Sequence, residues 1–96
     1  YIEDCLDATI KFMRQNNFCG PINIGSEQMV TINGLAHAAM RVSGKDLNIK
    51  HIDGPLGVRG RNSHNKLIYK VLKWKPKYNL MEGLKPTYQW IKNQVC

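Results

Sequence analysis

Pro21-Ile22-Asn23-Ile24-Gly25-Ser26 opens the stretch that decides the fold class, residues 21–52. The run is short and apolar and stops at a Gly-Ser pair, which is typical of a β-strand followed by a turn. A helix is then predicted over Thr31–Ser43, because Thr is a good N-cap and Gly44 can adopt the left-handed C-terminal turn. Residues 47–52 alternate in polarity and predict a second strand. Strand, helix and strand in this order indicate an α/β fold.

Three further helices are predicted outside this stretch. Apolar residues recur at three- and four-residue steps from Ile2 to about Gln15. A short helix is expected over Lys66–Lys73. The last helix is capped by Asn79, with Glu82 three residues later as in a capping box, and its apolar stripe reaches the end of the chain. Pro86 lies inside it, removes a backbone donor and should kink or delay it.

The 96 residues indicate a single domain, 1–96, and the charge is unevenly placed. There are 14 basic and 7 acidic residues, a net charge of +7. The first 48 residues carry a balance of −1 and the rest +8, so the second half is expected to meet an anion or to present a solvated lysine surface. No stretch approaches the roughly 20 apolar residues of a membrane helix.

The first residue and the cysteines indicate whether the chain is part of a longer protein and in which compartment it resides. Tyr1 already lies inside an amphipathic pattern, so we expect the translated product to begin elsewhere. Cys5, Cys19 and Cys96 are odd in number and lack metal-ligand spacing, which favours reduced thiols and no metal site. A cytoplasmic location is expected, with an organelle as the alternative if the chain is part of a larger assembly.

The loop 53–65 is the most informative segment for function. It contains the run Gly-Val-Arg-Gly-Arg-Asn-Ser at positions 57–63. A guanidinium group can donate two parallel hydrogen bonds to phosphate oxygens, and glycine lets a backbone approach a ligand closely. Arg59 and Arg61 therefore predict a diphosphate site, with Asn62, Ser63 and Asn65 as neutral donors. A surface loop tied down by acidic neighbours and contact with a nucleic-acid backbone are the alternatives.

Six motifs follow one another in the order of a known family. The chain resembles the C-terminal part of the NAD-dependent sugar-nucleotide epimerases and dehydratases, of the extended short-chain dehydrogenase/reductase family. The resemblance covers essentially all 96 residues. Its motifs are Tyr-Ile-Glu-Asp-Cys (1–5), Pro-Ile-Asn-Ile-Gly-Ser (21–26), Gly-Val-Arg-Gly-Arg-Asn-Ser (57–63), Trp-Lys-Pro (74–76), Glu-Gly-Leu (82–84) and Trp-Ile-Lys (90–92).

The resemblance implies roles for individual residues. Arg61 matches the arginine that holds the diphosphate of a GDP-sugar in the family, and Arg59, Asn62 and Ser63 share its loop. The implied fold is an α/β substrate-binding portion that lacks the NAD-binding Rossmann core.

Other positions either match packing residues or depart from the family pattern. Trp74 and Trp90 match packing positions and are expected in the core. His64 stands where the family usually has Asp, which removes a carboxylate partner for the arginines. Lys73 replaces a glycine before the Trp-x-Pro motif, at a cost on the order of 1 kcal/mol if its backbone is left-handed. Pro86 is the third departure.

The chain lacks the family's cofactor fingerprint. It has no Gly-x-Gly-x-x-Gly, so NAD is expected to be bound by an N-terminal part outside this sequence. Tyr69/Lys73 and Tyr88/Lys92 match the family's Tyr-x-x-x-Lys dyad, but both follow the arginine loop, whereas the dyad precedes it. We therefore expect no catalytic residue here and no activity from this chain alone.

Three interpretations of the function follow. The first is the substrate-binding part of a sugar-nucleotide epimerase, paired with a Rossmann-type part or chain and able to form a homodimer or larger assembly. The second is a degenerate or split dehydrogenase half that serves as a structural subunit. The third, a nucleic-acid-binding module, is weaker because no nucleic-acid motif is present.

Overall fold

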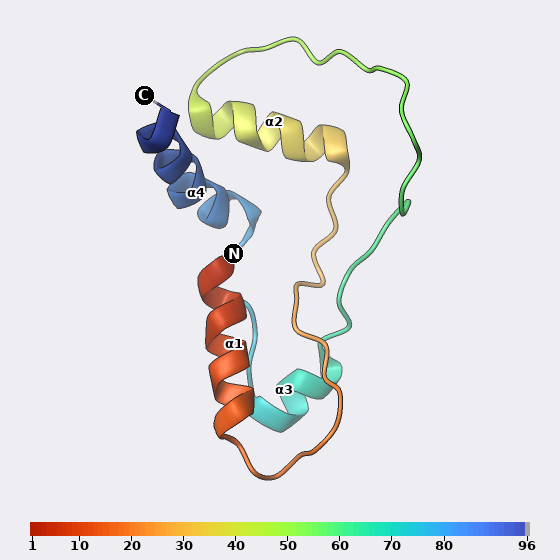
Figure 1. Ribbon diagram of the computed structural model, residues 1–96, viewed down its shortest axis with the longest axis vertical. Helices are drawn as coiled ribbons and strands as arrows, with labels where there is room; N and C mark the ends of the chain where they lie inside the picture. The colour runs from red at the N-terminus through yellow and green to blue at the C-terminus, as the bar shows by residue number, and fades with distance from the viewer. Residues whose placement is uncertain (96) are drawn as a thin grey trace. The chain divides into compact units, whose positions relative to one another are not determined.

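The computed structural model describes residues 1–95 and contains four helices over that range (Figure 1). They are α1 (Ile2–Arg14), α2 (Ile32–Ser43), α3 (Lys66–Leu72) and α4 (Leu80–Val95). All four predicted helices are thereby confirmed, with ends within a residue or two of those expected. None of these helices is both long and apolar enough to cross a membrane.

Local capping explains where α2 begins and ends. The Thr31 hydroxyl accepts a hydrogen bond from the amide of Gly34 at 2.9 Å, as a good N-cap does. At the other end Gly44 has φ 71°, the left-handed conformation that glycine adopts without steric cost. Both caps are confirmed as predicted.

The two predicted strands are wrong, and no strand occurs among residues 1–95. Ile22 and Ile24 nevertheless pack on a small core. A strand needs a ladder of hydrogen bonds to a second backbone, and no residue from 21 to 25 belongs to one. Residues 47–52 are exposed throughout. The α/β expectation is therefore not confirmed by the described part of the chain, which is helical.

The chain divides into two compact units. Unit 1 comprises Tyr1–Met29 and Arg61–Asn79, and unit 2 comprises Val30–Gly60 and the chain from Leu80 onward. Unit 1 therefore holds α1 and α3, and unit 2 holds α2 and α4.

The core of unit 1 is built from residues far apart in the sequence. Ala8 of α1, Ile68 of α3 and Trp74, which follows α3, are at most 4% exposed. The core position of Trp74 is thus confirmed. A Trp ring buries a large apolar area, so this residue anchors α1 to the segment after α3.

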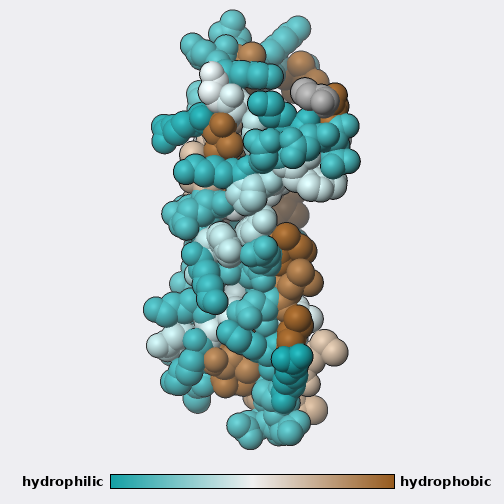
Figure 2. Space-filling view, turned by 90° about the vertical axis from the view of Figure 1, so that its left-hand side faces the viewer, coloured by the Kyte–Doolittle hydropathy of each residue, from teal (hydrophilic) through white to brown (hydrophobic). Residues whose placement is uncertain are grey.

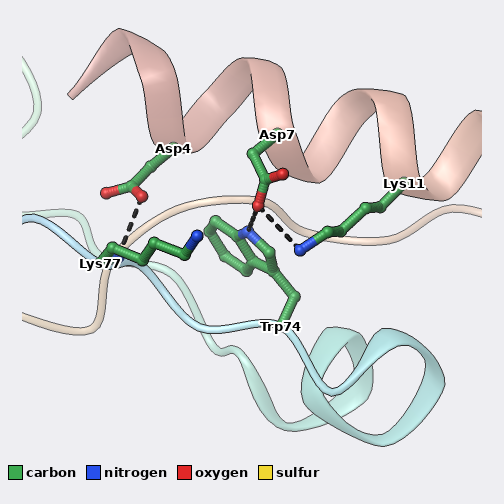
Figure 3. Close-up of polar contacts among 5 residues, drawn as sticks. All are labelled: Asp4, Asp7, Lys11, Trp74 and Lys77. Carbon is green, nitrogen blue, oxygen red and sulfur yellow. Dashed lines mark hydrogen bonds and ion pairs between the residues drawn. The ribbon is translucent and has the colours of Figure 1, made fainter.

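Two carboxylates of α1 fasten the same segment by hydrogen bonds (Figure 3). Asp4, 6% exposed, accepts the backbone amides of Lys77 at 2.9 Å and Tyr78 at 3.0 Å. Asp7 accepts the indole N–H of Trp74 at 3.2 Å and lies 3.1 Å from the ammonium of Lys11. A buried carboxylate needs such partners, since unpaired burial is costly.

These contacts set the titration of two groups. The hydrogen bond from Lys11 lowers the pKa of Asp7, and the indole of Trp74 adds to that effect. The phenol of Tyr78 donates to Glu3 at 2.9 Å, and this bond raises the pKa of Tyr78 because it favours the protonated form.

The apolar face of α1 points away from this core. Ile2, Leu6, Ile10 and Met13 are 45–78% exposed. The surface over α1 shows the corresponding apolar strip in Figure 2. The helical periodicity was predicted correctly, but the side of α1 that the unit buries is the one carrying Asp4 and Ala8.

Unit 2 consists of α2 packed on α4. The helix α4 begins at Leu80, before Pro86, and continues through Pro86 to Val95. The expectation that Pro86 delays this helix is therefore wrong. Trp90 is 64% exposed, and its predicted core position is wrong. No residue of α2 or α4 within the described range is fully buried, so unit 2 has only a thin apolar interface.

Candidate functional site

The predicted diphosphate-binding residues fall in both units. Arg61, Asn62 and Ser63 belong to unit 1, and Arg59 belongs to unit 2. Residues 53–65 contain neither helix nor strand, as expected for this loop, and residues 47–52, where a strand was predicted, contain neither as well. Arg59 and Arg61 are both exposed, and so is His64.

A network of hydrogen bonds fixes the backbone directly after Arg61. The side-chain amide of Asn65 donates to the carbonyl of Gly25 at 2.6 Å. The backbone amide of Asn65 donates to the Glu27 carboxylate at 2.9 Å, and the amide of Ser63 donates to the carbonyl of Ser26 at 3.1 Å. Residues 62–65 are thereby held against the turn 25–27.

The two neutral residues predicted to bind substrate are part of this network. Asn62 donates from its side chain to the carbonyl of Glu27 at 3.4 Å. The hydroxyl of Ser63 donates to the side-chain oxygen of Asn65 at 2.5 Å. Both residues therefore hold the loop in this structure, whereas the guanidinium of Arg61 takes no part in these bonds.

Gly25 permits the close approach of the loop to the turn. A Cβ built on Gly25 would lie 2.7 Å from the Cβ of Ser63, closer than real Cβ atoms come. The Pro-Ile-Asn-Ile-Gly-Ser motif thus has a physical reason for its glycine, namely the passage of residues 62–65 beside it.

Sequence reasoning missed Glu27, which lies just after the predicted turn and carries part of this network. Asn65 was expected as a neutral donor of the loop and instead donates within the protein, to Gly25 and Glu27. No short-range pattern could have joined them, because 38 residues separate the two along the chain.

Metal-ligating side chains and thiols are dispersed in the described part of the chain, residues 1–95. No group of three or more His, Cys, Asp or Glu residues gathers within that range. Cys5 and Cys19 are free and exposed.

Comparison with known proteins agrees with the motif order. GDP-mannose 3,5-epimerase of Arabidopsis thaliana is 44% identical over 95 residues, 99% of this chain. Two further proteins of the same plant are similar. UDP-glucuronic acid decarboxylase 3 is 34% identical over 88% of this chain, and GDP-L-fucose synthase 1 is 31% identical over the whole chain. No family model matches the chain.

The chain is therefore a homologue of part of the NAD-dependent epimerase/dehydratase enzymes, and the family resemblance of its motifs is confirmed. Within that group it is more similar to the GDP-mannose 3,5-epimerase than to the GDP-L-fucose synthase, at 44% against 31% identity. The chain spans only 25% of the length of the epimerase and 30% of that of the synthase.

Proposed function

We propose that this chain is the C-terminal, substrate-holding part of a sugar-nucleotide epimerase similar to GDP-mannose 3,5-epimerase. The observation that carries the proposal is the hydrogen bonding that fixes the loop after Arg61. Residues 62–65 are fastened to the turn 25–27 by hydrogen bonds, and the exposed Arg61 directly precedes the fastened segment. The 44% identity over 99% of the chain supports the same assignment.

Arg61 would bind the diphosphate of a GDP-sugar. Its guanidinium is permanently charged and can donate two parallel hydrogen bonds to phosphate oxygens. A fastened backbone reduces the conformational freedom lost when the side chain meets its ligand. Arg59, two residues earlier in the sequence, is a second candidate for this role.

The role of this part is positioning rather than bond-making. Holding the diphosphate fixes where the sugar lies, and such positioning lowers the barrier of the chemical step. NAD, which supplies hydride transfer in this family, is assigned to the part of the parent protein outside this chain. No activity is expected from the 96 residues alone.

The exposed apolar face of α1 supports a larger fold. Ile2, Leu6 and Ile10 are spaced four residues apart and are each at least 45% exposed. A contiguous apolar strip of this kind is a common mark of an interface. We assign it to contact with the Rossmann-type part of the parent enzyme.

A titration of the chain with GDP-mannose tests the diphosphate assignment. Arg61→Ala should weaken binding by about 10- to 100-fold, since a charge-assisted hydrogen bond contributes about 1.5–3 kcal/mol. Arg61→Lys should keep part of the affinity, because lysine keeps the charge but not the paired donors. Arg14→Ala, an exposed arginine at the end of α1, serves as the matched control and should change nothing.

Unchanged affinity in Arg61→Ala would remove the diphosphate assignment. In that case a structural subunit that binds no sugar nucleotide would become the better account of the chain.

A further inference from the structure

Unit 2 contains a pocket that the proposed function does not use. It is a hollow of about 530 Å³, open to solvent, between the C-terminal end of α2 and one side of α4. It is lined by Arg41, Val42, Ser43, Met81, Lys85, Tyr88, Gln89 and Lys92.

The side of α4 that faces this pocket carries two lysines. Met81, Lys85, Tyr88 and Lys92 follow one another at steps of four, three and four residues, which places them on one face of the helix. Arg41 contributes a third cation from the last turn of α2. No Asp or Glu of the described residues is part of the lining.

The end of α2 does not require these cations as caps. The carbonyl of Met40 accepts from the backbone amide of Lys45 and from the Ser43 hydroxyl, at 3.3 and 2.8 Å. The carbonyl of Arg41 accepts the amide of Gly44. The helix dipole leaves only about half a negative charge at this end, so the lining stays strongly positive.

Arg41, Lys85 and Lys92 are exposed around this hollow, and three cations without an acidic neighbour in the lining give a positive local potential that attracts anions. A pyrophosphate group carries enough negative charge to offset three cations, and the pocket is larger than a single phosphate needs. Tyr88, which is half-buried, offers an aromatic surface beside the charges.

We propose that this pocket is a second anion site, which takes the pyrophosphate group of a small molecule through Arg41, Lys85 and Lys92. The site is separate from Arg61 and does not depend on the proposed function. The pyrophosphate can be inorganic or belong to a nucleoside diphosphate, and the test distinguishes the two.

The test is calorimetric titration of the 96-residue chain carrying Arg61→Ala, so that the loop does not contribute. Inorganic pyrophosphate should bind saturably, and Lys85→Gln/Lys92→Gln should weaken it at least about tenfold. The matched control Lys50→Gln/Lys70→Gln removes the same charge from exposed lysines outside the pocket and should change affinity less than about twofold. Lys85→Arg/Lys92→Arg should retain binding, and helix content by circular dichroism should be equal in all variants.

The choice of ligand settles the source of the pyrophosphate. Tighter binding of GDP than of inorganic pyrophosphate supports a nucleotide, and equal affinity supports recognition of the phosphates alone. Guanosine binding as tightly as GDP would overturn the proposal, as would equal weakening by the two double variants or the lack of saturable binding by the Arg61→Ala chain.

Discussion

Gly25 is the residue on which the geometry of the arginine loop depends. Gly25→Ala should destabilise unit 1 by about 1–3 kcal/mol, because its Cβ would lie 2.7 Å from that of Ser63 and force the loop away. Urea denaturation measures the change. Gly54→Ala is the control: a Cβ added there would meet nothing within 4 Å, so it should be neutral or slightly stabilising. Equal effects of the two substitutions would contradict the close approach.

Lys73 carries backbone strain that the sequence already indicated. Lys73 has a φ of 54°, and among the described residues no other side-chain-bearing residue has a positive φ. The glycine that the family has at this position would adopt the same conformation without strain. The ammonium of Lys73 lies 5.3 Å from the centre of the Tyr69 ring, a contact that any truncation removes.

Comparing Lys73→Gly with Lys73→Ala therefore separates the backbone from the side chain. Both variants lose the contact with Tyr69, but only glycine relieves the strain, so it should be more stable than alanine by about 1 kcal/mol. Thermal unfolding of the two variants measures the difference. Equal stability would mean that the left-handed conformation at residue 73 costs nothing.

At the scale of the element, carboxylates of α1 bond to the segment 74–78. The stability that these bonds contribute should depend on pH. The pKa of Asp7 is lowered chiefly by Lys11, so its stabilising contribution is complete above the ordinary value of 3.8 and is lost as pH falls through the lowered pKa. Asp7→Asn removes this contribution.

Urea midpoints measured between about pH 2 and pH 6 test the effect. The wild-type chain should lose more stability on acidification than Asp7→Asn, because only the former must protonate a paired carboxylate. Parallel pH profiles for the two proteins would rule out a stabilising role for this group.

The sequence predicted the helices well and their surroundings poorly, for a physical reason. Helix boundaries depend on neighbouring residues such as Thr31 and Gly44, which act locally. Strands depend on a partner backbone that the pattern at 21–25 cannot specify, and these residues form no strand. The exposed position of Trp90 has the same origin, since periodicity finds an apolar face but not what covers it.

The candidate site was predictable to a similar extent. The motif at 57–63 identified Arg61 as an exposed cation in a loop, but the bonds that fasten the loop join residues 35–40 positions apart. Asn62 and Ser63 were predicted as ligand donors and instead bond within the protein in this structure.

At the scale of the whole molecule, the exposed apolar strip of α1 and the match to a quarter of a longer enzyme lead to one expectation. The 96 residues should replace the equivalent quarter of a relative and restore a working enzyme. The 44% identity to the Arabidopsis GDP-mannose 3,5-epimerase makes that protein the suitable host.

The most direct measurement is turnover of GDP-mannose by a chimera in which these 96 residues replace the aligned segment of that epimerase. The account predicts measurable epimerisation, and Arg61→Ala in the chimera should raise KM by about 10-fold or more through loss of a charge-assisted contact with the diphosphate. A folded chimera that neither turns over nor binds GDP-mannose, or one in which Arg61→Ala leaves KM and kcat unchanged, would contradict the central claim.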